Sequence, residues 1–175
     1  RLFRPRGHAG PETGERMSHY TVLVVGDDVS GALAPFDENG SKVRDAKWDW
    51  WCEGGRWSDR LVTRGGRACN STTIGDLDLD AMRAAGRRRA EGWWEEAMKR
   101  EDGRGREILY GIGPATTKEQ YLRQHETFNT FAVLKDGQWF ERGQMGWWGA
   151  VSNEKDADKW QAEFDKLLAS LPPET

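Results

Sequence analysis

The stretch YTVLVVG at Tyr20–Gly26 decides the fold class of this chain. Its β-branched and apolar side chains run without interruption up to the glycine, which is typical of a strand buried on both faces. We therefore expect residues 20–25 to form a central strand, with the other elements arranged around it.

Further strands are expected at Trp48–Cys52 and Trp57–Thr63. Near the other end of the chain, Thr127–Leu134 and Gln138–Arg142 flank the dipeptide Asp136-Gly137. An Asp-Gly pair between two apolar runs favours a tight hairpin turn. The strand pattern therefore predicts a hairpin here, and residues 143–152 follow it as a loop.

Helical periodicity begins after the first strands. Apolar residues at steps of three and four predict a helix from Asp76 to about Arg100, and the glycines at 103 and 105 are expected to end it. The T-x-x-E pattern at 116–119 predicts a capping box that opens a helix through about Glu126. A last helix is predicted from the periodic residues between Trp160 and Leu171, before Pro172.

This order of elements predicts an α+β domain over residues 17–175, with a mainly antiparallel sheet and about three helices packed on one face. Residues 27–40 are expected to be a loop. Residues 1–16 are rich in Arg, Gly and Pro and lack apolar periodicity, which predicts a disordered or appended leader.

The composition limits the classes of function. The mean hydropathy is −0.84 and no apolar run approaches the length of a membrane span, so we expect a soluble cytoplasmic protein without a membrane partner. The net charge of −3 argues against binding to duplex nucleic acid, which depends on a positive surface. A basic cluster at Arg83 and Arg87–Arg89 is followed by Glu91, Glu95 and Glu96, which favours a solvated helix face over a phosphate site.

Metal and catalytic motifs are weak. Cys52 and Cys69 form no CxxC pair and the three histidines are scattered, so we expect free thiols and neither a bound metal nor a cofactor. Asp27 and Asp28 follow the first strand and, with Glu53, would suit a metal-dependent hydrolase. Capping of a turn by the aspartate side chains is the simpler explanation and is favoured here. The Gly-Ile-Gly-Pro sequence at 111–114 could receive an anion at a helix start.

Tryptophan is the unusual residue, with ten copies in 175 residues. Six of them fall in two glycine-bounded segments, KWDWWCEGGRW at 47–57 and GQMGWWG at 143–149. In the first segment, strand alternation is expected to place Trp48 and Trp50 on one face and Trp51 on the other. Aromatic rings stack on flat guests and arginine binds phosphate, so the segments predict a binding site, although a tryptophan-rich core or a homo-oligomer interface would use the same residues. The candidate ligand-binding residues are Trp48, Trp50, Glu53, Arg56, Trp57, Trp147 and Trp148.

The segments WDWWCEGGRW, TFAVLKDGQWFERGQMGWWG and HYTVLVVGDD with LAPFDENG resemble an uncharacterised family of proteins encoded by tailed bacteriophages and prophages. The resemblance spans about residues 18–171. Family members often carry a longer insertion before the WDWW segment and continue past the LPP sequence, where this chain ends at Thr175.

The resemblance implies a phage accessory protein acting in the cytoplasm of the infected bacterial host. By analogy with small phage proteins that blunt host defence, we expect it to bind and sequester a nucleotide-derived molecule without catalysis. Two alternatives stay open: an inhibitor that binds a host defence protein through its tryptophan-rich surface, and a metal-dependent hydrolase.

Overall fold

The computed structural model describes residues 2–6, 19–40, 46–146 and 150–175. The chain divides into two compact units. Unit 1 comprises Arg1–Leu77 and Asn129–Thr175, and unit 2 comprises Asp78–Phe128. The helices of unit 2 bury apolar side chains on one another. That residues 17–175 form one domain stays a prediction.

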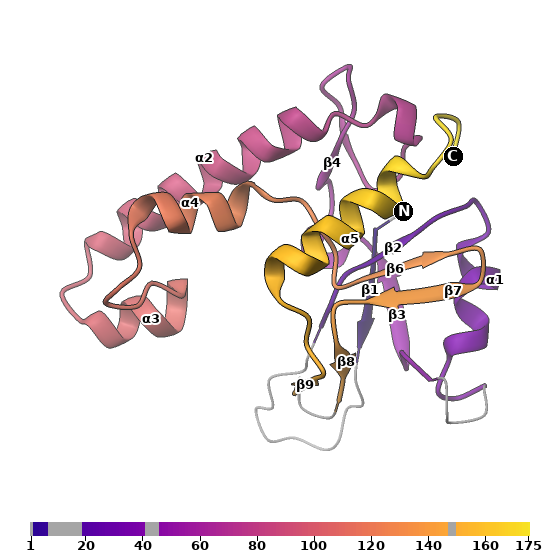
Figure 1. The fold of residues 1–175 in the computed structure, drawn as a ribbon, viewed down its shortest axis with the longest axis horizontal. Coiled ribbons are helices and arrows are strands. Elements are labelled where there is room, and N and C mark those ends of the chain that lie inside the picture. The colour runs from indigo at the N-terminus through magenta and orange to yellow at the C-terminus, as the bar shows by residue number, and fades with distance from the viewer. Residues whose placement is uncertain (1, 7–18, 41–45, 147–149) are drawn as a thin grey trace. The chain divides into compact units, whose positions relative to one another are not determined.

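Unit 1 contains a five-stranded sheet with the strand order β3-β1-β2-β6-β7 (Figure 1). The predicted central strand is confirmed: β2 lies in the middle, and Val22 and Val24 are buried. The strands are β1 (Leu2–Arg6), β2 (Val22–Val24), β3 (Trp50–Glu53), β6 (Ala132–Lys135) and β7 (Gln138–Glu141).

The α+β class is confirmed, but the sheet is mixed because β2 and β6 run parallel. The pairs β1–β2, β1–β3 and β6–β7 are antiparallel. Parallel neighbours need a long crossover connection, and here unit 2 forms part of that connection. Of the five described α-helices, α1 and α5 belong to unit 1 and α2, α3 and α4 to unit 2, and the expected packing of about three helices on one face stays a prediction.

The leader expected at residues 1–16 includes β1, which pairs with β2 on one edge and β3 on the other. Residues 7–16 of that leader lie outside the described part of the chain. The run LFRPR offers only two apolar residues and a proline, so the strand pattern is hard to detect before the partner strands are known.

The predicted hairpin at Asp136-Gly137 is confirmed between β6 and β7. Both turn residues have positive φ angles, 51° for Asp136 and 71° for Gly137, as a type I′ turn requires. Two smaller antiparallel pairs complete the strands of unit 1. They are β4 (Leu61–Val62) with β5 (Ala68–Cys69), and β8 (Gln144–Met145) with β9 (Val151–Ser152).

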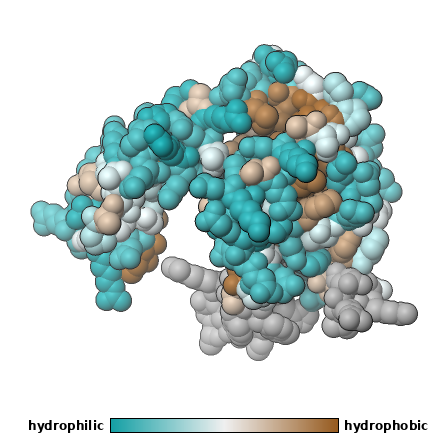
Figure 2. All heavy atoms as spheres, viewed as in Figure 1, coloured by the Kyte–Doolittle hydropathy of each residue, from teal (hydrophilic) through white to brown (hydrophobic). Residues whose placement is uncertain are grey.

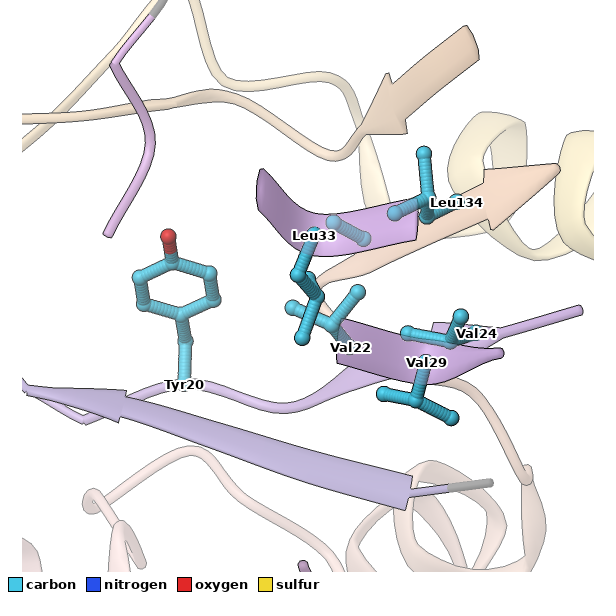
Figure 3. Packing of buried hydrophobic residues seen from close by; sticks show 7 residues of the cluster. Tyr20, Val22, Val24, Val29, Leu33 and Leu134 are labelled. Carbon is cyan, nitrogen blue, oxygen red and sulfur yellow. The ribbon is translucent and has the colours of Figure 1, made fainter. Parts of the chain in front are cut away.

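One face of the sheet packs on helix α1 (Val29–Leu33), which occupies part of the predicted loop at 27–40. Asp28 caps this helix by accepting a hydrogen bond from the Gly31 backbone N–H at 2.9 Å. Figure 3 shows Leu33 beside Val22 and Val29 beside Val24. We call this the core cluster; its buried members are Tyr20, Val22, Val24, Val29, Leu33, Ala132 and Leu134. The short 3-10 helix η1 (Ala34–Phe36) follows α1.

The predicted C-terminal helix is confirmed as α5 (Ala157–Ala169), drawn in yellow in Figure 1. Trp160, Phe164 and Leu168 form its buried face. The Trp160 Nε1 donates a hydrogen bond to the Thr130 carbonyl oxygen at 2.8 Å, which ties the helix to the start of β6.

Unit 2 contains α2 (Leu79–Met98), α3 (Gly103–Tyr110) and α4 (Lys118–Glu126). Asp78 caps α2, so the helix begins three residues later than predicted, and the 3-10 helix η3 (Ile74–Asp76) precedes it in unit 1. The predicted capping box of α4 is shifted by one residue, because Thr117 and Gln120 form it in place of Thr116 and Glu119. The buried residues that pack together are Ala90, Ala97, Ile112, Tyr121 and Leu122.

Helix α3 is absent from the sequence-based prediction, because Gly103 and Gly105 indicate the end of a helix. The structure uses them differently: Asp102 caps α3 by accepting from the Gly105 backbone N–H, and Gly111 ends it in the left-handed conformation. An aspartate before the helix and a glycine after it are the signals that would have revealed it.

None of the helices in the described ranges combines the length and apolar character needed to cross a membrane.

Gly86 allows α2 and α4 to approach closely. A Cβ atom at Gly86 would overlap the carbonyl oxygen of His125, whereas one at Gly92 would meet nothing within 4 Å. We expect Gly86→Ala to lower the free energy of unfolding by about 2 kcal/mol, because the backbone of α4 must shift. Gly92→Ala in the same helix is the matched control, and we expect it to raise stability by up to about 1 kcal/mol. Urea unfolding of both variants, followed by far-UV circular dichroism, measures the two changes; equal effects would contradict the close approach.

Candidate functional site

The first tryptophan segment contributes side chains to both faces of the sheet. Trp48 lies before β3 in an isolated bridge with Asp37, and it packs against the core cluster together with Trp51. The predicted alternation is therefore wrong at Trp48, because the regular strand begins only at Trp50. Trp48 shares the core side with Trp51.

Trp48 has a structural role in this arrangement. Its Nε1 donates a hydrogen bond to the Leu33 carbonyl oxygen at 3.0 Å, close to the C-terminal end of α1. The ring is half-buried. Trp48 therefore joins the connection before β3 to the core cluster, and its predicted role in ligand binding stays a prediction.

Trp50 is the exposed ring of this segment, with 42% of its surface accessible. It begins β3, which is an edge strand of the five-stranded sheet. Alternation along β3 directs Trp50 to the face opposite Trp51 and the core cluster. Among the large apolar residues of unit 1 that the structure describes, Trp50 is the one that remains exposed.

A tight turn follows β3 and carries the next candidates. The 3-10 helix η2 (Gly55–Trp57) begins after Gly54, whose φ angle is 64°. A Cβ atom at Gly54 would lie within 2.9 Å of the Asn70 amide and closer still to Ser58, so only glycine fits. Packing within the chain therefore accounts for the glycine at position 54.

Asn70 fixes the turn from the neighbouring strand pair. Its Oδ1 accepts a hydrogen bond from the Asp59 backbone N–H at 2.7 Å, and the Ser58 hydroxyl donates to the Gly55 carbonyl oxygen at 2.7 Å. Trp57 is half-buried in this turn and Glu53 is exposed at the end of β3. The backbone of Arg56 lies in η2, while its side chain is outside what the structure describes.

The second tryptophan segment reaches the same core cluster from β8. Met145 packs against the cluster, and the Gly146 backbone N–H donates to the Ala150 carbonyl oxygen at 2.8 Å. Trp147 and Trp148 lie outside the described residues, so their predicted role in binding stays a prediction. Residues from both tryptophan segments, which are far apart in sequence, therefore pack against the same core cluster: Trp48, Trp51 and Met145.

A polar group, unnoticed in the sequence, lies beside the core cluster. Lys47 Nζ contacts Glu141 Oε1 at 2.8 Å, and Trp139 Nε1 donates to Glu141 Oε2 at 3.0 Å. The Tyr20 hydroxyl donates to the Lys47 carbonyl oxygen. We call these four residues, Tyr20, Lys47, Trp139 and Glu141, the polar cluster. Trp139 and Glu141 are two residues apart on β7, so alternation could have indicated that they share a face.

Burial raises the pKa of Tyr20 above its ordinary value, and the negative charges of Glu141 and Asp49 raise it further. The phenol therefore remains a hydrogen-bond donor throughout the neutral pH range. Both oxygens of Glu141 already accept hydrogen bonds from within the chain. The polar cluster thus acts mainly to hold β7, the segment before β3 and the residues before β2 together.

The residues of the hydrolase alternative are used locally. Asp28 caps α1 through its side chain, while Asp27 is exposed and Glu53 lies at the end of β3. Within the described ranges, no group of three or more histidine, cysteine, aspartate or glutamate side chains could hold a metal ion. Cys52 and Cys69 are free thiols, as expected from their spacing.

The predicted anion site at 111–114 is occupied by bonds within unit 2. The Gly113 backbone N–H donates to Thr116 Oγ1 at 3.1 Å, and the Thr116 backbone N–H donates to the Gly113 carbonyl oxygen at 3.0 Å. The Thr117 backbone N–H donates to the Gln120 side chain at 3.0 Å. The backbone N–H groups of Gly113, Thr116 and Thr117 therefore stabilise the start of α4 through bonds within the chain.

The basic cluster of α2 is partly neutralised. Arg87 Nη1 contacts Glu126 Oε1 at 2.5 Å and Arg87 Nη2 contacts Glu119 Oε2 at 3.1 Å, both in α4. Hydrogen bonding to Arg87 lowers the pKa of Glu119. Arg87 therefore joins two helices, which agrees with a solvated helix face rather than a phosphate site.

Comparison with known proteins finds no family model, curated protein or solved structure that matches this chain.

Tyr20→Phe tests the polar cluster. At pH 7 we expect a loss of about 1–2 kcal/mol in the free energy of unfolding, because the Lys47 carbonyl oxygen loses its donor. Since the pKa of Tyr20 is raised by folding, its stabilising contribution is complete below the unfolded-state value of about 10 and declines above it.

The stability difference between the wild type and Tyr20→Phe should therefore narrow above pH 10, by about 1.4 kcal/mol per pH unit. Denaturant titrations at several pH values between roughly 8 and 11 measure this difference. A difference that stays constant across that range would show that Tyr20 titrates equally in the folded and unfolded states.

Proposed function

We propose that this chain binds a flat, anionic molecule of the nucleotide class and holds it without chemical change, as an accessory protein of tailed bacteriophages that counters host defence. The observation that carries the proposal is the exposed Trp50 on the edge strand β3, which leads into the turn that contains Arg56 and Trp57. The phage context rests on the sequence resemblance.

Exposure of Trp50 supports stacking. A tryptophan ring that is 42% accessible at the edge of a sheet is costly in water and suits a planar guest. Stacking of a base on an aromatic side chain is worth roughly 1–3 kcal/mol. Trp50 is thus the strongest of the candidate stacking residues that the structure describes.

The spacing along β3 also supports a nucleotide. Trp50 and Glu53 are at the two ends of the strand, about 10 Å apart by the rise of an extended chain. Arg56 follows in η2, and a guanidinium binds phosphate in a bidentate manner. A base at Trp50 and a phosphate near η2 would then span the strand, with the Gly54 turn fixing the distance between them.

Retention without chemistry agrees with the way these polar side chains of unit 1 are used. Glu141 accepts two hydrogen bonds from within the chain, Tyr20 remains protonated, and Asp28 caps a helix. Each of these side chains already has a structural partner, which favours a binding protein over an enzyme.

Trp50→Ala is the direct test. We expect it to weaken binding by roughly 1–3 kcal/mol, which corresponds to about a 5- to 150-fold rise in Kd. Isothermal titration calorimetry against a panel of cyclic and ADP-ribose-type nucleotides measures the change. Mass spectrometry of the small molecules released from heat-denatured protein shows whether the guest leaves unaltered.

Trp93→Ala is the matched control, because Trp93 is 41% exposed but belongs to unit 2. We expect this variant to bind as the wild type does. Absence of binding to every nucleotide tested, or equal losses in the two variants, would overturn the proposal.

A second candidate is inhibition of a host defence protein by direct contact. Its support is the position of β3 at the sheet edge, where a partner strand could pair and Trp50 could anchor the interface. Copurification from an infected host distinguishes the two functions. The inhibitor is favoured if a stoichiometric protein partner copurifies, if Trp50→Ala abolishes its binding, and if heating releases no small molecule.

A further inference from the structure

Helix α3 carries its most apolar side chains on its outer side. Ile108 is 59% exposed and Leu109 is 60% exposed, and none of the residues of α3 is buried. Figure 2 shows this apolar surface on the otherwise mainly hydrophilic surface of unit 2. Large exposed apolar residues that lie together on a small unit mark an interaction surface.

The geometry of α3 explains the exposure. Arg106 and Tyr110 are half-buried, and Tyr110 packs against the buried residues of unit 2, so these two residues define the inner side of the helix. Ile108 lies two residues from each, a rotation of about 200°, and it therefore points away from the unit. Arg106 Nη1 also contacts the Met98 sulfur at 3.8 Å, which fixes the helix on α2.

Helix α3 has few local sources of stability. It is eight residues long and contains Gly103 and Gly105. Helices of this length are marginal in water, and glycine is a poor helix former. A partner surface that buries Ile108 and Leu109 would therefore add stability that the sequence of α3 does not provide.

The charges beside Ile108 indicate what covers it. The N-terminal half of α3 carries Arg104, and the C-terminal half carries the exposed Glu107 together with the negative end of the helix dipole. When two such helices pair in opposite directions, the cationic half of each faces the anionic half of the other. A two-fold axis produces this match automatically, since both copies present the same surface.

We propose that α3 is the contact of a homodimer, in which Ile108 and Leu109 of two copies pack together and Arg104 of each copy faces Glu107 of the other. A partner of uniform charge, such as nucleic acid, would attract only one of the two charged halves of α3 and repel the other. The inference is independent of ligand binding at Trp50, because α3 belongs to unit 2 and Trp50 to unit 1.

Sedimentation equilibrium of the full chain tests the dimer over roughly 1 to 200 μM. We expect concentration-dependent dimers for the wild type, and at least a tenfold rise in the dimer dissociation constant for Ile108→Lys and for Leu109→Lys. Ala84→Lys adds the same charge at another exposed position of unit 2 and should leave the constant unchanged. Far-UV circular dichroism checks that each variant is folded.

Charge reversal tests the opposed direction of the helices. Arg104→Glu and Glu107→Arg should each weaken the dimer, and the double variant should restore it, because the pairs are re-formed with opposite sign. A wild-type chain that stays monomeric throughout the concentration range, or a dimer unaffected by both lysine variants, would overturn the proposal. Failure of the double variant to recover would exclude the antiparallel contact. If one lysine variant does not fold, the other lysine variant and the charge-reversal variants still test the dimer contact.

Discussion

The parallel pairing of β2 with β6 is the contact on which the rest of unit 1 depends. Val22 is opposite Ala132 and Val24 is opposite Leu134, so residues more than 100 positions apart form one buried ladder. The Val25 backbone N–H extends it by donating to the Leu134 carbonyl oxygen at 2.9 Å. Because parallel strands require a long connection, the chain that follows β2 must leave the sheet before it returns as β6, and residues 78–128 of that connection form unit 2.

The same pairing explains why the polar cluster forms where it does. Once β6 lies beside β2, the hairpin places Trp139 and Glu141 on the face that the core cluster occupies, near Tyr20 and Lys47. A half-buried lysine and glutamate are tolerated there because each is paired at hydrogen-bond distance and Trp139 satisfies the second carboxylate oxygen. Trp48 and Trp139 on this face are therefore held by internal hydrogen bonds, and among the described tryptophans of unit 1 the exposed one, Trp50, lies on the other face.

Local signals predict the parts of this fold that local chemistry controls. The apolar run at 20–25, the Asp136-Gly137 turn and the periodic face of Trp160, Phe164 and Leu168 each specify their element without help from distant residues. The strand β1 and the parallel pairing depend on partners far along the chain, which a single sequence does not reveal. Helix α3 is hidden for another reason: its glycines serve as capping positions, and its apolar residues face outward.

The candidate site shows the same limit. Composition singles out the tryptophan segments, but the distinction between a ring that packs and a ring that binds is made by where the strand begins. Because β3 starts at Trp50, Trp48 lies two residues outside the regular strand and bonds to Leu33 on the core side. Alternation within β3 then places Trp51 inward and Trp50 outward. A shift of β3 by one residue would therefore exchange the positions of Trp50 and Trp51. Pairing with β1 sets the register of β3, and the apolar pattern of the sequence does not indicate β1.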